Sequence, residues 1–228
     1  MVRVYWPMMV RMTPDTHVPV VQAERNALCD SLLALGPDAP TLCDPWRTRD
    51  LAAHLVLREH RPDLASGIWF ALLEGHMERG QAALAAGDYT ALVERVRSGP
   101  PRWSPTHFAK VDALFNTTEL VIHHEDALRG DGAVGPRREV PERTSRATLS
   151  ALRKSASLMF RRAGVGVRLE APGADTITAG KGASVVTVTG APVELLLVAS
   201  GRMRVADDVL DGAPEDVQTL KNARLGVS

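Results

Sequence analysis

The apolar pattern of this chain changes its period once, and that change is the strongest constraint on its fold. Before residue 141, apolar side chains recur at three- and four-residue spacing, which predicts amphipathic helices over 18–35, 48–58, 62–87, 89–97 and 105–129. One more helix is predicted over 142–162. Beyond it, β-branched residues alternate over 165–170, 176–178 and 184–189, which is typical of strands. The sequence therefore predicts an α+β protein.

Clusters of glycine and proline indicate where the domains meet. Gly130, Gly132, Gly135 and Pro136 end the longest helical pattern and suit a hinge near residues 130–141. Because several helices with modest loops precede any strand, we expect an antiparallel four-helix bundle over 18–135 and a smaller α+β domain over 141–228. The second domain is expected to include one helix that begins near Pro192 and a short one that runs from Pro214 to about residue 225.

The first 17 residues are expected to form an irregular extension. The segment from Met1 to Met12 lacks the long apolar stretch and the small-residue cleavage site of a secretory signal. Met12 is also a natural alternative start of translation. We therefore leave this extension out of the fold argument.

Charge and hydropathy argue against nucleic-acid and membrane partners. The 27 basic and 27 acidic side chains cancel, and no run of like charges forms a patch that would attract a phosphate backbone. No window approaches the roughly 18 uncharged apolar residues that a membrane span needs. Cys29 and Cys43 are too few for a disulfide framework, lack the spacing of a zinc knuckle and have no obvious catalytic setting. We expect reduced cysteines in a cytoplasmic protein, either a monomer or a homodimer.

Three side chains have the types and spacing of metal ligands. Glu119 and His123 lie four residues apart on the longest predicted helix, so they share one face beside its apolar stripe. His124 is expected to point elsewhere, into solvent. His54 lies on the apolar side of the second helix, where a buried imidazole needs a partner. Spacing alone favours the ordinary alternative, in which Glu119 and His123 form an ion pair and His54 is a hydrogen-bonded core residue.

If the two helices pack face to face, His54, Glu119 and His123 form a set of two imidazoles and one carboxylate. Such a set suits zinc with a fourth position open to water or substrate. It also accepts iron, nickel or manganese.

Two segments resemble a known superfamily. Residues 45–55, PWRTRDLAAHL, resemble the tryptophan-to-histidine segment of the DinB-like, mycothiol-dependent maleylpyruvate isomerase N-terminal superfamily, and residues 116–126, NTTELVIHHED, resemble its second metal-binding helix. The resemblance implies that His54, Glu119 and His123 hold a divalent metal in a four-helix bundle.

The C-terminal part also resembles this superfamily. Residues 188–197, VTGAPVELLL, and the following Ser200-Gly201-Arg202 resemble the small α+β domain of the maleylpyruvate isomerases, which is similar to sterol carrier proteins. The chain is most similar to an uncharacterised actinobacterial branch described only as metal-binding. Its 23 arginines against 4 lysines agree with a GC-rich source.

The resemblance implies an activity that depends on metal and mycothiol. A cation with an open position lowers the pKa of a coordinated thiol until it deprotonates. The thiolate would then isomerise an unsaturated acid by reversible addition, or be transferred to a small electrophile. Arg202 is a candidate to hold a substrate carboxylate, although a surface arginine is an equally good interpretation.

Two other functions remain open at this point. The same metal would activate water in a hydrolase, with Glu125 or Asp126 as the base, although exposed carboxylates are the more common interpretation of both. Alternatively, the protein is a non-catalytic module that binds metal or a small apolar ligand, with Leu195, Leu197 and Val198 lining a cavity in the second domain. Those three residues are more simply explained as core.

Overall fold

The computed structural model describes residues 19–60, 74–101 and 109–226. Within the N-terminal part it contains the helices α1 (Val20–Leu35), α2 (Thr48–His60), α4 (Glu74–Ala85), α5 (Tyr89–Ser98) and α6 (Ala109–Leu128). The predicted extension over 1–17, the predicted helix start at Pro62 and the first residues of the pattern over 105–129 lie outside the described residues.

Local sequence signals explain where several of these helices begin and end. Gly36 ends α1 with a φ of 78°, and its N–H donates to the carbonyl of Leu32. The left-handed region costs glycine little, so this position suits a helix end. Asp88 precedes α5 and accepts a hydrogen bond from the N–H of Ala91 at 2.7 Å. The side chain thereby satisfies one of the free donors of the first turn.

A threonine hydroxyl joins the N-terminus of α2 to the preceding helix. Thr48 is the first residue of α2 and donates its hydroxyl to the carbonyl of Gly36. The side chain of Asp50 accepts from the N–H of Arg47 at 2.8 Å. The hydroxyl of Thr48 therefore ties the start of α2 to the end of α1.

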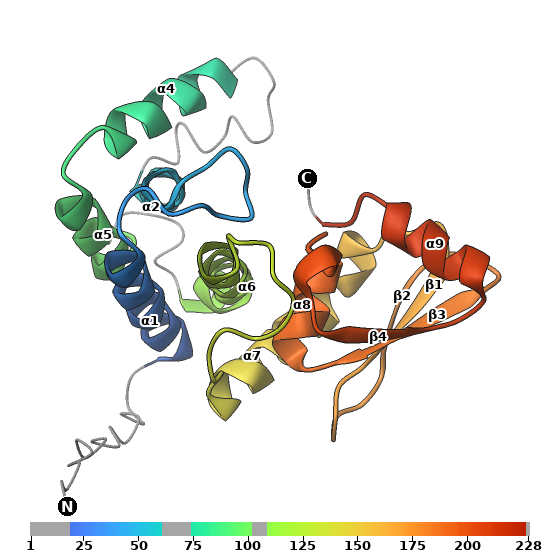
Figure 1. Ribbon diagram of the computed structural model, residues 1–228. Helices are drawn as coiled ribbons and strands as arrows, with labels where there is room; N and C mark the ends of the chain where they lie inside the picture. The colour runs from blue at the N-terminus through green and yellow to red at the C-terminus, as the bar shows by residue number, and fades with distance from the viewer. Residues whose placement is uncertain (1–18, 61–73, 102–108, 227–228) are drawn as a thin grey trace, which may run out of the picture.

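The N-terminal helices pack around one apolar core. α1 lies against α5 and α6, and α2 lies against α4 and α5 (Figure 1). Residues one helical turn apart supply the fully buried face of each helix, among them Leu28 and Leu32 of α1, Leu51 and Leu55 of α2, and Val93 of α5. A buried ion pair, Arg25 with Glu59 at 2.7 Å, also joins α1 to α2.

The C-terminal part combines helices with a small sheet. Helix α7 (Glu142–Met159) precedes the strands β1 (Gly166–Glu170), β2 (Ile177–Gly180) and β3 (Val185–Gly190), and helix α8 (Pro192–Ala199), strand β4 (Asp208–Asp211) and helix α9 (Pro214–Asn222) follow. The order across the sheet is β2-β1-β3-β4. β1 runs parallel to β3, and the other neighbouring pairs are antiparallel. The fold class is thus α+β, as predicted.

Apolar and polar side chains alternate along the strands, and the apolar ones form a second core around the sheet. Val167 and Leu169 of β1 and Val186 and Val188 of β3 are buried, while Arg168 points outward. Because α7 lies against β2 and α8 against β3, one face of the sheet is covered by helices.

The sequence prediction missed β4. A four-residue strand that begins and ends with aspartate carries little β signal. β4 pairs with β3 and lies at one edge of the sheet.

Helix α6 belongs to both halves of the molecule. Its Leu120 and Ala127 pack in the N-terminal core, while Val121 and Ile122 pack with the core around the sheet. In Figure 1, α6 lies between the other N-terminal helices and the pair α7 and α8. It packs against α1, α2, α7 and α8. The boundary over 135–141, the antiparallel four-helix arrangement and the likeness to sterol carrier proteins stay predictions.

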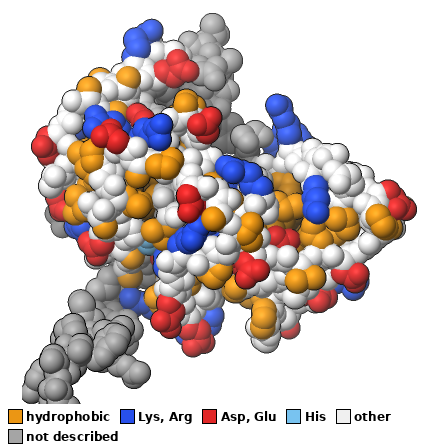
Figure 2. Space-filling model, in the orientation of Figure 1, with side chains coloured by type: hydrophobic (Ala, Val, Ile, Leu, Met, Phe, Trp, Pro, Cys, Tyr) orange, Lys and Arg blue, Asp and Glu red, His pale blue; other side chains and the backbone are white. Residues whose placement is uncertain are grey.

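The structure also shows how charged side chains and apolar helices are distributed. On the face drawn in Figure 2, acidic and basic side chains are interspersed. No helix in the part of the chain that the structure describes has the length and apolar character to cross a bilayer. The cytoplasmic location and the oligomeric state stay predictions.

Candidate metal centre

The structure brings the three predicted ligands together. One nitrogen of His54, one nitrogen of His123 and one oxygen of Glu119 all lie within 4.8 Å of one another. Nε2 of His123 is 3.2 Å from Oε2 of Glu119, and the two imidazole rings have their centroids 5.2 Å apart. Tetrahedral ligands with bonds of about 2.0–2.2 Å lie roughly 3.4 Å from each other, so the set is close to a binding geometry.

Two helices position these side chains. Glu119 and His123 are one turn apart on α6, and His54 comes from the middle of α2. The ring of His54 packs on the indole of Trp46, with centroids 5.0 Å apart. The guanidinium of Arg58, one turn further along α2, lies 3.8 Å from Oε2 of Glu119. Packing and charge therefore restrict the positions of the His54 and Glu119 side chains.

The charges around the three residues shift their pKa values in different directions. Burial and the positive charge of His123 lower the pKa of His54 to about 3. Burial raises the pKa of Glu119, but the hydrogen bond and charge of His123 outweigh it and lower that pKa to about 2. Burial lowers the pKa of His123, but hydrogen bonds with Asp126, Cys43 and Glu119 outweigh this effect and raise that pKa well above its usual value. His54 is thus neutral at physiological pH and Glu119 is ionised.

Asp126 supports His123 from the side opposite Glu119. Its Oδ2 lies 3.0 Å from Nδ1 of His123, and its carboxylate receives Nε and Nη2 of Arg202 at 3.0 and 2.9 Å. The sequence prediction favoured an exposed carboxylate at this position. The structure corrects this expectation, since Asp126 is fully buried. Hydrogen bonds to His123 and Arg202 overcome the effect of burial and lower the pKa of Asp126 to about 2.

Cys43 is a neighbour of the centre that sequence reasoning missed. Its Sγ donates to Oδ2 of Asp126 at 3.1 Å, and Nη2 of Arg202 lies 3.7 Å from the sulfur. With His123 and Asp126, Cys43 forms a second group whose possible ligand atoms all lie within 4.8 Å of one another. No spacing rule connects Cys43 to α6, so only the folded chain reveals this group.

The loop that carries Cys43 is held against the end of α6. The N–H of Leu42 donates to the carbonyl of Asp126 at 3.0 Å. At Gly130, a Cβ atom would lie only 1.9 Å from the carbonyl oxygen of Pro40. The close approach of the loop therefore requires glycine at this position.

His124 is buried, contrary to the prediction that it faces solvent. Its Nδ1 lies 2.8 Å from Oε1 of Glu24, and its Nε2 lies 2.8 Å from the hydroxyl of Ser31. Both partners belong to α1, which packs on α6. The prediction was wrong because α1 covers the side of α6 that carries His124.

Glu125 is also buried rather than exposed. Its carboxylate pairs with Arg129 at 2.7 Å and with Arg138 at 2.8 Å. Arg129 reaches on to Glu194 of α8 at 2.6 Å, and Arg138 reaches Glu24 at 2.7 Å. These five residues, which we call the interdomain charge chain, alternate in sign and connect α1 to α8.

Arg202 lies beside the centre, just after α8. Its Nε and Nη2 bond to Asp126, and its Nη1 donates to the carbonyl of Ser200 at 2.7 Å. This places the predicted substrate-binding arginine next to the carboxylate that supports His123.

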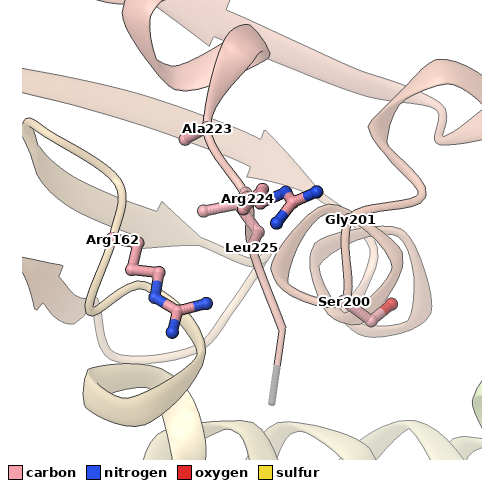
Figure 3. A pocket seen from close by; sticks show the side chains of 6 residues that line it. All are labelled: Arg162, Ser200, Gly201, Ala223, Arg224 and Leu225. Atoms are coloured by element: carbon pink, nitrogen blue, oxygen red, sulfur yellow. The ribbon is translucent and has the colours of Figure 1, made fainter. Parts of the chain in front are cut away.

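A cavity lies in the C-terminal part of the chain. It has a volume of about 550 Å³ and lies between the end of α7, the end of α8 and the C-terminal segment (Figure 3). Its lining consists of Arg162, Ser200, Gly201, Ala223, Arg224 and Leu225. Leu195, Leu197 and Val198 do not line it, because they are buried in the core around the sheet.

Comparison with known proteins shows a shared fold. No family model matches the sequence, and no curated protein matches it. Two solved structures do match, a mycothiol-dependent maleylpyruvate isomerase and a histidine-to-alanine variant of that isomerase. Their sequence identities are 17% and 16%, with a TM-score of 0.57 for each. In both cases the match covers 86% of this chain and 92% of the other, so the likeness extends over both halves.

Proposed function

We propose that this protein binds a divalent metal through His54, Glu119 and His123 and uses it to activate mycothiol. The thiol then acts on a small electrophile, either in an isomerisation or in an S-transfer. The observation that carries this proposal is the convergence of the three ligand atoms within 4.8 Å, on a fold shared with a mycothiol-dependent isomerase. The assignment to an actinobacterial branch of that superfamily remains part of the proposal.

The hydrogen bonding of His123 supports metal binding on the side of Glu119. Nδ1 faces the buried carboxylate of Asp126, which accepts a hydrogen bond from it, and Nε2 faces Glu119. A histidine that ligates a metal almost always donates its other N–H to a carboxylate, carbonyl or water, which fixes the ring and its tautomer. Asp126 has this relation to His123, and Arg202 in turn holds Asp126 in place.

His54 also has the properties of a ligand. With a pKa lowered to about 3, its imidazole is neutral at physiological pH and has a free lone pair for a cation. Three protein ligands leave a fourth position of a tetrahedral ion open. When bound there, a divalent cation supplies the positive charge that lowers the pKa of a thiol.

Zinc is the first candidate for the ion, because two imidazoles and one carboxylate are a frequent ligand set of catalytic zinc. Nickel, iron and manganese are alternatives for the same set. The nucleophile is assigned to mycothiol because Cys43 is already hydrogen-bonded to Asp126, and Cys29 is fully buried. Arg202 is proposed to hold a carboxylate of the substrate with a part of its guanidinium.

Metal analysis of the purified protein tests the site itself. We expect one divalent ion per chain, and we expect His54→Ala and His123→Ala to lose it. Glu119→Gln should weaken binding, while the matched change Glu94→Gln at an exposed ion pair of α5 should leave it intact. Metal content that is unchanged in all three site variants would overturn the ligand assignment.

Activity assays test the role of the thiol. The metal-loaded protein is incubated with maleylpyruvate or with electrophilic acceptors, with and without mycothiol. Turnover should require both the thiol and the metal. Turnover that is indifferent to mycothiol would eliminate the isomerase and the transferase together.

The other two functions have less support. A hydrolase would need Glu125 or Asp126 as a free base, yet Glu125 pairs with two arginines and Asp126 receives Arg202, His123 and Cys43. A binding module for a small apolar ligand would need a cavity at Leu195, Leu197 and Val198, which are fully packed in the core.

A further inference from the structure

The two ring nitrogens of His123 face two different sets of possible metal ligands. Nε2 faces Glu119, with His54 beside it, and Nδ1 faces Asp126, with Cys43 beside it. The proposed function uses only the first set, which we call the histidine seat. The second set, Cys43, His123 and Asp126, we call the thiol seat.

The thiol seat has distances close to those of a cation site. Oδ2 of Asp126 lies 3.1 Å from Sγ of Cys43 and 3.0 Å from Nδ1 of His123. A zinc-like ion with an S–metal bond of about 2.3 Å and N– and O–metal bonds of about 2.0 Å keeps its ligands roughly 3.3–3.6 Å apart. Small movements of the three side chains would therefore admit an ion.

The chemistry of the thiol seat differs from that of the histidine seat. Thiolate is a soft ligand that selects thiophilic ions, whereas a set of imidazole and carboxylate also suits harder ions such as manganese. The thiolate of Cys43 and the carboxylate of Asp126 together balance the two charges of the ion. Arg202 can keep its bond from Nε to Oδ1 of Asp126, and its Nη2 already lies within 3.7 Å of the sulfur.

We propose that Cys43, His123 and Asp126 form a binding site for a soft divalent cation, and that this thiol seat excludes an ion from the histidine seat. The existence of the thiol seat is independent of the proposed function, whereas the exclusion rests on it. In the metal-free protein both ring nitrogens of His123 face carboxylates, so the ring starts as an imidazolium with a proton on each nitrogen. Binding displaces the thiol proton of Cys43 and the Nδ1 proton of His123 to solvent, and the Nε2 proton stays on the ring.

The exclusion follows from the tautomers of one imidazole. A neutral imidazole has one nitrogen with a lone pair and one with a proton. When Nδ1 binds an ion, Nε2 carries the proton and donates it to Glu119, which lies 3.2 Å away. When Nε2 binds an ion, Nδ1 donates to Asp126. A thiophilic ion thus takes the thiol seat and leaves His54 without a metal, while a harder ion takes the histidine seat.

Cadmium titration of the metal-free, full-length protein tests the thiol seat. Cadmium bound to a thiolate gives a near-ultraviolet charge-transfer band, and we expect this band to saturate at one ion per chain. Cys43→Ser should lose the band, whereas Cys29→Ser, the matched change at the other cysteine, and His54→Ala should retain it. A wild-type protein without the band, or a band that survives in Cys43→Ser, overturns the proposal.

A measurement on the unmodified chain guards against misfolding of the variant. Saturating cadmium should protect Cys43 of the wild-type protein from iodoacetamide, as read by peptide mass analysis. Magnesium, which does not favour sulfur, should give no protection. Equal labelling of Cys43 with and without cadmium would argue against the seat.

Manganese separates this proposal from the proposed function. Manganese binding should be retained in Cys43→Ser and lost in His54→Ala, and cadmium should abolish it in the wild-type protein. Manganese binding that does not need His54 would contradict the histidine seat and leave the cadmium result standing. Simultaneous binding of both ions at full occupancy would contradict the exclusion.

Discussion

Asp126 is the residue on which most of the centre converges. It is fully buried, and it accepts hydrogen bonds from Cys43 in the loop before α2, His123 one turn earlier on α6 and Arg202 after α8. Three segments that are distant in sequence thus share one carboxylate. A residue with this many partners controls the orientation of the ring beside it.

Replacing Asp126 by Asn tests this control. The amide keeps the size of the side chain but loses the charge that fixes His123, and loss of such a partner typically weakens metal binding by about 10–100-fold. Competition with a chromophoric chelator would measure the change. Asp30→Asn, which affects only an exposed pair with Arg97, should leave the affinity unchanged. Wild-type affinity in Asp126→Asn would show that the carboxylate does not position the ligand.

The two cysteines should react very differently with iodoacetamide. Burial raises the pKa of Cys29 to about 12, and its thiol donates to the carbonyl of Val93. Because the thiolate is the reactive form, Cys29 should be alkylated in folded protein only very slowly at pH 8. Cys43 is partly exposed and should be labelled first. Mass analysis of peptides before and after unfolding in urea reads both sites, and equal rates in the folded state would contradict the burial of Cys29.

At the scale of elements, the end of α6 and the loop before α2 depend on each other. Gly130 lets the backbone at Pro40 approach, and the N–H of Leu42 bonds to the carbonyl of Asp126. This contact brings Cys43 to the face of α6 that carries His123. A helix end and a loop therefore position the centre together.

Gly130→Ala should displace this loop. The added methyl would meet the carbonyl of Pro40, which belongs to the backbone, and such overpacking typically costs about 1–3 kcal/mol of unfolding free energy. Urea denaturation would measure the loss. Gly75→Ala is the matched control on α4, because its Cβ would meet only the flexible end of Arg79 at 3.8 Å. Equal stability of the two variants would contradict a tight contact at Gly130.

At the scale of the whole molecule, the interdomain charge chain joins the two halves. Glu24 of α1, Arg138, Glu125 and Arg129 lead in alternating sign to Glu194 of α8. Four of these residues are buried, and Arg138 is 14% exposed, so the charges are little screened. Removing one member leaves its partner with an uncompensated buried charge.

The charge chain should make stability depend on pH in the acidic range. Burial raises the pKa of Glu24, but the hydrogen bond of His124 and the charge of Arg138 lower it overall, below the ordinary 4.5. A carboxylate with a lowered pKa stabilises the fold above its unfolded pKa, and this stability is lost as the pH falls through the folded value. The melting temperature should therefore decrease as the pH is lowered below about 4.5. Glu24→Gln should melt lower at pH 7 and show a flatter profile. A profile as steep as that of the wild type would contradict this role.

Local pattern was sufficient for a large part of this protein. Helical periodicity and β alternation predicted the α+β class and most of the elements, because those signals depend only on neighbours along the chain. The spacing of Glu119 and His123 placed both on one face of α6 for the same reason. The helix packing places their possible ligand atoms within 4.8 Å of one in His54.

Other features exist only because distant segments pack together. β4 forms by pairing with β3, His124 is buried because α1 covers it, and Cys43 reaches Asp126 through a loop held at Gly130. Arg202 meets Asp126 across 76 residues of chain. No periodicity records such contacts, since burial and pairing between distant residues depend on the whole fold. The sequence by itself determined the elements and the residue types of the candidate site, and the tertiary structure decided which side chains surround them.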